Sequence, residues 1–299
     1  MLVHLNNNAE TPGRVVVVGA RGFIGAALMS RLQRDGVAAL PISSADIDLS
    51  QKGSDEALAG RLRATDSVVM LSCRTPDKGR DLGTTMQNLA MGYHFVTAAA
   101  KVGCRHVVYF SSDAVYGDDT QWVTDDTKAE PGSPYGAMHL TREVLLKSAM
   151  AGVLAVIRPT LVYGLADTHG SYGPNRFRRM RDKDGKISLF GQGEERRDHI
   201  FIDDLVELTL RVLHWRSVGM LLGVTGRSPS FGEIAALIAK QSNPPAEIVH
   251  LPRANPAAPI LHRHFDITGA LTAFPDMRYT AIEDGVALID RQAREAARA

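Results

Sequence analysis

The stretch RVVVVGARGFIG, residues 14–25, decides the fold that this chain is expected to adopt. Its run of valines is typical of a strand buried on both faces, and the residues from about Phe23 to Asp35 follow with helical spacing. Between the two elements, Gly19, Gly22 and Gly25 stand in a GxxGxxG pattern. Glycine allows a tight turn and a close approach of the backbone, so that a pyrophosphate can lie on the helix N-terminus. The stretch therefore predicts a dinucleotide-binding turn, and a simple packing turn is the alternative.

The same alternation of strand and helix continues along the first two thirds of the chain. Further strands are expected at VAALPIS (37–43), SVVML (67–71), HVVYFSS (106–112) and LAVIRP (154–159). Helices are expected over 88–103, with Gly103 as the C-cap, and over 133–152. Strands that lack alternation and are separated by helices indicate a parallel sheet covered on both faces. The predicted class is α/β, a doubly wound parallel sheet of the Rossmann type.

Three regions are expected along the chain, because the pattern loosens after Pro159. Residues 1–13 are predicted to be a flexible tail, and 14–165 the dinucleotide-binding domain. Residues 166–299 are predicted to be mainly a smaller α/β substrate-binding region, with some segments returning to the first domain. The elements expected there are a loop leading into a helix over 166–186, two short strands around a turn and a helix from near Asp203 within 187–213, and a helix over 231–242.

Composition excludes several classes of protein. Lysine and arginine number 34 against 33 acidic residues, which gives no electrostatic footprint for nucleic acid or an anionic membrane. The chain begins without a basic segment followed by an apolar one, and its apolar runs are of strand length. The two cysteines, Cys73 and Cys104, lie far apart without zinc-ligand spacing, so neither a disulfide framework nor a metal site is indicated. A cytoplasmic protein is expected.

The end of the second expected strand bears on the choice of dinucleotide. Proteins that bind NAD in this way usually have an acidic residue there for the ribose 2′-hydroxyl. Here the position falls on Ser43 or Ser44, and Arg21 lies inside the glycine turn, which favours the 2′-phosphate of NADP; Arg21 as a solvated loop residue is the alternative. Asp48 is placed to reach the adenine edge or, alternatively, to cap a helix. The expected cofactor is NAD(P), with NADP preferred.

Several motifs occur along the chain in a fixed order. They are GARGFIG (19–25), Asn88, SSDAVYG (111–117), YGAMH (135–139), IRPTLVYG (157–164), GQGEERRDHIFIDD (191–204) and HFDIT (264–268). On these motifs the chain resembles the extended short-chain dehydrogenase/reductases, the NAD-dependent epimerase/dehydratase family that acts on nucleotide sugars. The resemblance extends from about residue 14 to residue 290.

The resemblance implies roles for individual residues. Tyr135 would be the catalytic acid/base, and Ser112 would form a hydrogen bond with the reacting oxygen. Asn88 would belong to the cofactor site. Asn175 and Arg197 would bind the nucleotide sugar and its diphosphate.

Arg263 would be a second contact for the diphosphate, since a guanidinium recognises phosphate through two hydrogen bonds. For Arg197 the alternative is an ion pair with Glu194 or Asp198. A solvated helix face is the preferred interpretation of four further arginines, Arg176, Arg178, Arg179 and Arg181.

Two residues depart from the pattern of the family. His139 stands where the family has a lysine that binds the nicotinamide ribose and lowers the pKa of the tyrosine. A histidine with an ordinary pKa of about 6.5 is largely neutral at pH 7, so it supplies less field, although one ring nitrogen can still reach the ribose. His139 therefore predicts slower proton transfer, a different base, or chemistry that does not need a phenolate.

Asp113 is the second departure. Nucleotide-sugar 4,6-dehydratases have an Asp–Glu pair here, whereas Asp113 is followed by Ala114. A 4,6-dehydratase is therefore disfavoured. Asp113 either donates a proton to the substrate or binds a loop backbone.

The expected function is that of an enzyme that oxidises a sugar carbon by hydride transfer to NAD(P) and then epimerises, eliminates or reduces. An NADPH-dependent 4-keto-sugar reductase and a catalytically impaired NAD(P)-binding regulator are the alternatives. The resemblance also implies a homodimer formed through the helices that contain Asn88 and Tyr135.

Overall fold

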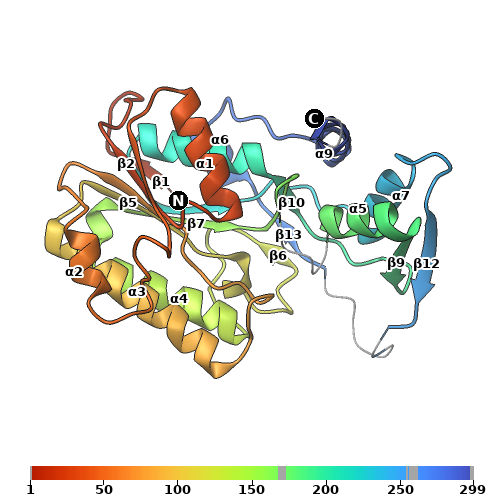
Figure 1. The fold of residues 1–299 in the computed structure, drawn as a ribbon, viewed down its shortest axis with the longest axis horizontal. Helices are drawn as coiled ribbons and strands as arrows, with labels where there is room; N and C mark the ends of the chain where they lie inside the picture. The colour runs from red at the N-terminus through yellow and green to blue at the C-terminus, as the bar shows by residue number, and fades with distance from the viewer. Residues whose placement is uncertain (1, 168–172, 254, 256–261, 297–299) are drawn as a thin grey trace.

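A seven-stranded sheet forms the centre of the larger lobe (Figure 1). The computed structural model describes residues 2–167, 173–253, 255 and 262–296. The strand order is β1-β11-β7-β5-β4-β2-β3, and only β1 runs antiparallel to its neighbour. The strands are β1 (Leu2–His4), β2 (Val15–Val18), β3 (Ala39–Ile42), β4 (Ser67–Met70), β5 (His106–Phe110), β7 (Leu154–Pro159) and β11 (Ser217–Gly223). The predicted α/β class with a doubly wound parallel sheet is confirmed.

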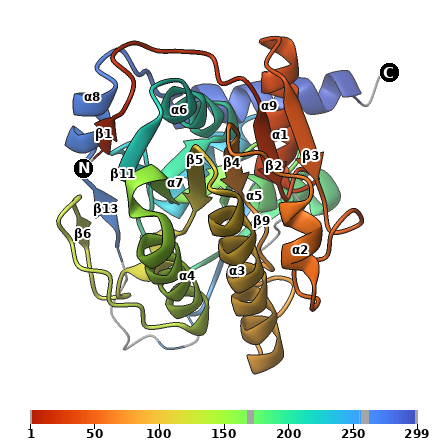
Figure 2. The same cartoon turned by 90° about the vertical axis from the view of Figure 1, so that its left-hand side faces the viewer.

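Helices cover both faces of this sheet (Figures 1 and 2). One face carries α1 (Phe23–Arg34) and α6 (Ile202–His214), and the other carries α2 (Ser54–Ala59), α3 (Leu82–Val102) and α4 (Pro134–Met150). The valines of β2 explain this arrangement, because successive side chains of a strand point to opposite faces. Val15 and Val17 join the apolar core under α1 and α6, whereas Val16 and Val18 join the core under α2, α3 and α4.

A smaller lobe packs around a separate apolar cluster that includes Phe177, Ile187 and Ile234. It contains α5 (Gly173–Asp184), β9 (Lys186–Phe190), α7 (Phe231–Ala239) and β12 (Glu247–Leu251), and β9 and β12 pair in parallel. The remaining elements are β6 (Trp122–Val123), β8 (Leu161–Tyr163), β10 (His199–Phe201), β13 (His264–Phe265), α8 (Thr268–Ala273) and α9 (Ile282–Ala296), with short 3₁₀ turns at Asp113–Val115 and Ala151–Val153. No helix within the described ranges is long and apolar enough to cross a membrane.

The N-terminal residues differ from the predicted flexible tail. Residues 2–4 form β1 at the edge of the large sheet, and the His4 ring lies 2.8 Å from Ser217 Oγ and 3.1 Å from Ala273 O. A strand of three residues is too short to show a hydrophobic period, so the sequence pattern could not reveal it. By contrast, Gly103 ends α3 in the left-handed conformation at φ 69°, as the sequence predicts for a C-cap.

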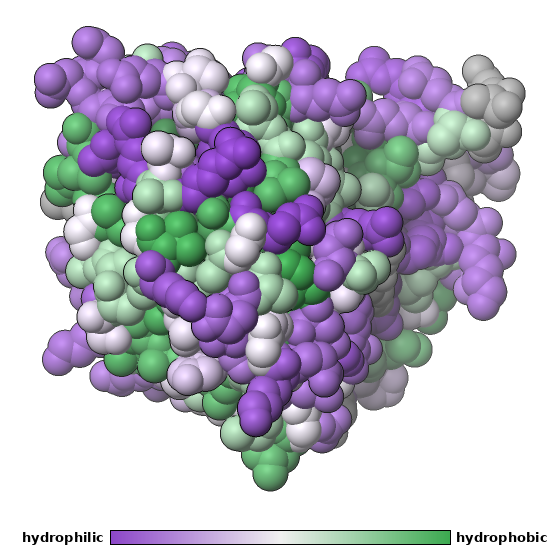
Figure 3. Space-filling view, turned by 60° about the vertical axis from the view of Figure 1, so that its left-hand side comes forward, coloured by the Kyte–Doolittle hydropathy of each residue, from purple (hydrophilic) through white to green (hydrophobic). Residues whose placement is uncertain are grey.

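Helices α3 and α4 lie side by side and expose several large apolar side chains. On α3 these are Leu82, Met86 and Tyr93, with 76%, 55% and 58% of their surface exposed; on α4, Val144 is 57% exposed. The space-filling view shows apolar patches set between polar ones on this side of the molecule (Figure 3). Single exposed apolar residues are ordinary on a protein surface; here four of them lie on two adjacent helices.

A buried ion pair fixes α4 against the sheet. Glu143, on α4, is fully buried and accepts hydrogen bonds from Arg158 Nε and Nη2 at 2.9 and 2.7 Å. Ser111, directly after β5, donates to the same carboxylate at 2.6 Å. Arg158, on β7, also donates to the Tyr116 hydroxyl at 2.8 Å. The network therefore joins α4 to two neighbouring strands.

Replacing Glu143 with glutamine should lower the free energy of unfolding by about 3–5 kcal/mol, because Arg158 would retain a buried charge without a carboxylate. Guanidinium denaturation measures this. The matched control is Glu56→Gln, which breaks an exposed pair with Lys101 (2.6 Å) and should change stability by less than about 1 kcal/mol. Equal losses in the two variants would contradict the assignment.

The pH dependence of this contribution follows from the same contacts. Burial opposes ionisation, but the hydrogen bonds and charge of Arg158 together hold the pKa of Glu143 below its ordinary value of 4.5. A carboxyl group whose pKa is lowered on folding stabilises the fold fully above its unfolded value. The contribution is therefore complete at neutral pH and is lost as the pH falls through the lowered folded value.

Candidate functional site

A cavity of about 680 Å³ opens at the carboxyl ends of β2, β4 and β5. From β2 the chain moves outward to β3 on one side and continues with β4 on the other, so the cavity lies where the strand order reverses. Doubly wound sheets bind their ligands at this place, and the volume is typical of small-molecule sites. Asp167, His199 of β10, and Gly173, Pro174 and Asn175 at the start of α5 complete the wall.

The glycine turn after β2 forms a cradle in this wall. Gly19 adopts φ +97°, and a Cβ on it would lie 2.9 Å from Ser72 N. Gly22 is the N-cap of α1, and a Cβ on Gly25 would collide with Gly19 O. Only glycine leaves this space open at the helix N-terminus, so the turn fits the diphosphate of a dinucleotide, which Gly19, Gly22 and Gly25 would hold through their backbone.

The polar residues after β3 lie outside the lining of the cavity. Ser43 N and Oγ both donate to Asp46 Oδ2, at 2.8 and 2.6 Å. These bonds, with a smaller effect of the Arg21 charge, lower the pKa of Asp46. Arg21 and Ser44 are exposed. The position at the end of β3, where Ser43 or Ser44 replaces the usual acidic residue, therefore has the carboxylate of Asp46 bound to the Ser43 hydroxyl.

Asp48 has a different local role from the helix cap considered above. Its Oδ1 accepts from Ser50 N and Oγ at 3.0 and 2.8 Å, which closes a turn. Helix α2 begins only at Ser54, with Gly53 as its N-cap.

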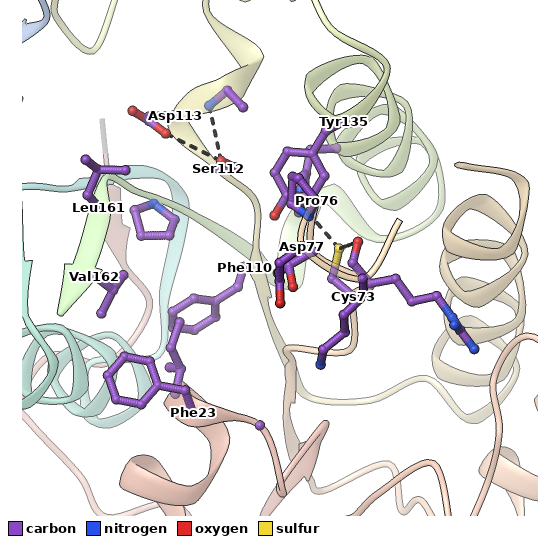
Figure 4. Close-up of a pocket in the computed structure, with 18 of the residues that line it drawn as sticks. Phe23, Cys73, Pro76, Asp77, Phe110, Ser112, Asp113, Tyr135, Leu161 and Val162 are labelled. Carbon is purple, nitrogen blue, oxygen red and sulfur yellow. Dashed lines mark hydrogen bonds between the residues drawn. The ribbon is translucent and has the colours of Figure 1, made fainter. Parts of the chain in front are cut away.

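Tyr135 enters the cavity from the first turn of α4 (Figure 4). Ser133 caps this helix by accepting from Gly136 N at 3.2 Å, and Pro134 occupies its first position. A Cβ on Gly136 would collide with Ala114 O, so the helix end can lie directly against the turn that follows β5. This contact places Tyr135 next to Ser112 in the cavity (Figure 4).

Ser112 and Asp113 both line the cavity. Ser112 Oγ accepts from Ala114 N at 3.1 Å and lies 3.5 Å from Asp113 Oδ1, a long contact that leaves the hydroxyl hydrogen free to turn towards a ligand. Burial raises the pKa of Asp113, and the charges of Arg263 and Arg197 oppose this effect.

His139 lies one turn beyond Tyr135, with ring centroids 4.7 Å apart and planes at 83°. It is 2% exposed, with Nδ1 2.7 Å from the Tyr109 hydroxyl and Nε2 3.8 Å from Cys73 Sγ. Burial, followed by the charge of Arg142, lowers the pKa of His139 well below 6.5. The histidine is therefore neutral at neutral pH, and a bond from either ring nitrogen to a ribose would replace a contact within the protein.

Asn88 is buried and holds the loop that follows β4. Its side chain accepts from Arg74 N at 2.8 Å and donates to Arg74 O at 2.9 Å. This loop supplies Cys73, Arg74 and Lys78 to the cavity wall, none of which was among the predicted site residues. The available signal was the polar, basic run CRTPDKGR directly after a strand.

The three residues expected to bind substrate lie in different surroundings. Asn175 lines the cavity, donates to Gly164 O, and leaves Oδ1 without a partner in the described part of the chain. Arg197 lies outside the lining and pairs with Glu195 at 2.7 Å, which is neither of the two partners considered from the sequence.

Arg263 is buried behind the cavity. It donates to the carbonyl oxygens of Asp113, Gly117 and Tyr116 at 3.0, 2.5 and 3.5 Å and so fastens the turn after β5 from behind. Arg181, expected on a solvated face, is also buried, and it pairs with Asp290 at 2.6 Å.

The cavity therefore brings together Gly19, Gly22, Gly25, Asn88, Ser112, Asp113, Tyr135, His139 and Asn175. The predicted residues that lie outside its lining are Arg21, Ser43, Ser44, Asp48, Arg197 and Arg263.

Known proteins share this architecture. UDP-glucose 4-epimerase of Mycolicibacterium smegmatis is 28% identical over 263 residues, covering 78% of this chain and 84% of its own. The structure of UDP-glucose 4-epimerase from Thermotoga maritima with UDP-glucose has a TM-score of 0.82 at 19% identity, covering 95% of this chain and 99% of its own. MoeE5 in complex with UDP-glucuronic acid and NAD has a TM-score of 0.79 at 21% identity, covering 95% of this chain and 100% of its own.

The sequence profile of the NAD dependent epimerase/dehydratase family matches residues 15–220, which include the glycine cradle, the turn after β5 and the whole of α4. The chain therefore belongs to the NAD-dependent epimerase/dehydratase family, within the extended short-chain dehydrogenase/reductases, and is an NAD(P)-dependent enzyme of that family.

Proposed function

We propose that this enzyme epimerises a nucleotide sugar by reversible oxidation of a hydroxyl-bearing sugar carbon, with Tyr135 as the acid/base. The observation that carries the proposal is that Tyr135 lies next to Ser112 in the cavity that the glycine cradle also lines. The names of the relatives support a nucleotide sugar such as UDP-glucose as the substrate class. A 4,6-dehydratase is disfavoured because Ala114 follows Asp113.

When bound, the dinucleotide supplies the acceptor for the hydride of the sugar carbon. The ionised Tyr135 takes the proton of the hydroxyl group on the same carbon. The carbon loses a hydride and its oxygen loses a proton, so the carbon–oxygen single bond becomes a carbonyl. The Ser112 hydroxyl, released from its long contact with Asp113, donates to that oxygen throughout. On the return step the ketone would present its opposite face, so that the returning hydride inverts the carbon while Tyr135 gives the proton back to the oxygen. Asn175 Oδ1 remains available to accept a hydrogen bond from the substrate.

Replacing Tyr135 with phenylalanine should lower turnover of UDP-glucose to its 4-epimer by a factor of about 10² to 10⁴, because the proton transfer is lost. The affinity for the dinucleotide should stay the same. Coupled assay of the epimer and calorimetric titration measure the two quantities. Tyr93→Phe, at an exposed tyrosine on α3, is the matched control. A Tyr135→Phe variant with normal turnover would remove Tyr135 from the chemistry. A native protein that binds the dinucleotide but converts no nucleotide sugar would favour the alternative of a catalytically impaired NAD(P)-binding regulator.

For the dinucleotide, we propose NAD rather than the NADP preferred from the sequence. The preference for NADP is based on Ser43 or Ser44 at the position of the acidic ribose contact and on Arg21 in the glycine turn, whereas Asp46 accepts two hydrogen bonds from Ser43. A carboxylate held there accepts a ribose hydroxyl but repels a 2′-phosphate. Arg21 alone would have to offset this repulsion.

Titration of the apo-protein should therefore show NAD binding at least tenfold more tightly than NADP, a difference of about 1.4 kcal/mol. Asp46→Asn should narrow this ratio, since it removes the charge while keeping an acceptor for Ser43. Asp126→Asn, at an exposed aspartate between β6 and α4, should leave the ratio unchanged. Equal or tighter binding of NADP by the native protein would favour Arg21 as the phosphate contact.

A homodimer formed through α3 and α4 is also proposed, on the exposed apolar residues of these two helices. Light scattering after gel filtration should give twice the monomer mass of 32.4 kDa. Tyr93→Glu should yield the monomer, because it would bury a charge in the contact. Phe190→Glu, at an equally exposed aromatic residue on β9, should remain dimeric. A native monomer, or dissociation by both variants alike, would contradict the proposed surface.

A further inference from the structure

Arg142 is a buried cation close to the catalytic tyrosine. It lies on α4 three residues beyond His139 and seven beyond Tyr135, spacings that place all three on one face of the helix. Arg142 is 1% exposed. It donates to Ser72 O through Nη1 at 3.0 Å and to Asn88 O through Nε at 2.8 Å and Nη2. Within the described residues its partners are carbonyl oxygens and no carboxylate, so its permanent charge meets dipoles and no opposite charge.

The groups around Arg142 respond to this charge. Burial raises the pKa of Tyr109 and of Cys73, and the Arg142 charge is the next contribution, opposing burial at both groups. At His139, burial and the Arg142 charge act together to lower the pKa. The positive charge of Arg142 therefore favours the deprotonated forms of Tyr109 and Cys73 and the neutral form of His139.

Three polar side chains, Tyr109, His139 and Cys73, form a layer next to Arg142 and Tyr135. The Tyr109 hydroxyl lies 2.7 Å from His139 Nδ1, and the positive charge of Arg142 near its oxygen favours the arrangement in which Tyr109 donates its hydrogen to that nitrogen. The single proton of the neutral imidazole is then on Nε2, facing Cys73 Sγ at 3.8 Å. Cys73 donates to Arg74 O at 3.6 Å (Figure 4), and its sulfur accepts from the Tyr135 hydroxyl. The sulfur thus accepts from both His139 and Tyr135. Once Tyr135 is ionised, the Cys73 S–H can turn from Arg74 O to the phenolate oxygen, and the donors then run in one direction from Tyr109 to Tyr135, an arrangement in which polarisation is cooperative.

We propose that Arg142 is a positioning residue that supplies the fixed positive charge of this site, acting on Tyr135 through the layer formed by Tyr109, His139 and Cys73. His139 is then a neutral link in this layer and not a weak substitute for a cationic lysine. The inference rests on the proposed role of Tyr135 as acid/base.

Arg142 also has a structural role, since its hydrogen bonds tie α4 to α3 and to the loop after β4. Two substitutions separate charge from structure. Arg142→Gln removes the charge but retains amide donors for the carbonyl oxygens, whereas Arg142→Lys retains the charge with fewer donors. The double variant His139→Lys with Arg142→Gln returns a cation to the layer at a different position.

The test is a spectroscopic titration of Tyr135 in the protein without substrate. The ultraviolet difference between each variant and the same variant carrying Tyr135→Phe reports the ionisation of this one tyrosine. Arg142→Gln should move the midpoint upward by about one pH unit or more, and Arg142→Lys should leave it near the native value. The double variant should recover at least half of the shift. A folded Arg142→Gln protein with the native midpoint would overturn the proposal, as would a folded double variant without recovery.

The charged and titratable groups that face this layer are the same in all these variants apart from the substituted positions. They are His139, Arg142 and Glu143 on α4, Tyr109 and Asp113 from β5 and its turn, and Cys73, Arg74, Asp77 and Lys78 from the loop after β4. If Arg142→Gln does not fold, Tyr109→Phe tests the same route, because it removes a link without touching the guanidinium. An upward shift supports the proposal, and an unchanged midpoint overturns it.

Turnover of UDP-glucose distinguishes failure of this inference from failure of the proposed function. A base must be ionised to act, so a higher midpoint moves the rising limb of the pH–turnover profile upward and lowers kcat near neutrality while KM stays constant. A shifted titration with no activity in any form of the protein leaves the electrostatic role of Arg142 standing and rejects the epimerase function. An unshifted titration in an active Arg142→Gln enzyme does the reverse.

Discussion

The buried pair of Glu143 and Arg158 is the contact on which the geometry of the site depends. Two charges removed from water are tolerable only when their hydrogen-bonding capacity is filled, and here Ser111 and Tyr116 complete the network. Because Ser111 directly precedes Ser112, the same carboxylate that anchors α4 also fixes the turn opposite it. A rotation or slide of α4 would break several charged hydrogen bonds at once. The first turn of α4, with Tyr135, is therefore held against the turn after β5.

The neighbouring residues Arg142 and Glu143 are both buried and charged, but only Glu143 is paired with an opposite charge. Glu143 points to the sheet, where Arg158 neutralises it at 2.7 Å and Lys147 approaches to 3.5 Å. Arg142 points to α3 and to the loop after β4, where its acceptors are the carbonyl oxygens of Ser72 and Asn88. The charge on the sheet-facing side of α4 is thus neutralised by an ion pair, whereas the side that faces α3 has a positive charge without a carboxylate partner. Two consecutive residues of one helix can in this way have different roles: Glu143 fixes the helix against the sheet, and Arg142 supplies a positive electrostatic potential on the other side.

The parts of the structure that follow local rules were predictable from the sequence. The four valines and the glycine spacing of residues 15–25 specify a strand, a turn and a helix through their own conformational preferences. The position of Tyr135 in the first turn of a helix follows in the same way from Ser133 and Pro134, which are typical of a helix start. These elements needed no information about distant contacts.

What could not be predicted depends on partners far apart in the sequence. Tyr109 and Cys73 lie 30 and 66 residues from His139, and the sheet register alone brings them to its two ring nitrogens. Arg263 meets the turn after β5 across 150 residues, so a guanidinium expected to bind phosphate is occupied by backbone carbonyls. The bond between Ser43 and Asp46 is local, but it depends on a turn geometry that hydrophobic spacing does not encode.

The interior of α4 also explains why position 139 suits a histidine in this chain. A lysine there would lie one turn from Arg142 in a region from which water is excluded, and two unpaired cations in such a place repel each other strongly. The lysine would lose its proton and, with it, the charge for which it is useful. A neutral imidazole avoids this repulsion and connects Tyr109 to Cys73 through both nitrogens. Residues 139 and 142 are therefore best understood as one unit, in which a cation at the second position requires a neutral hydrogen-bonding ring at the first.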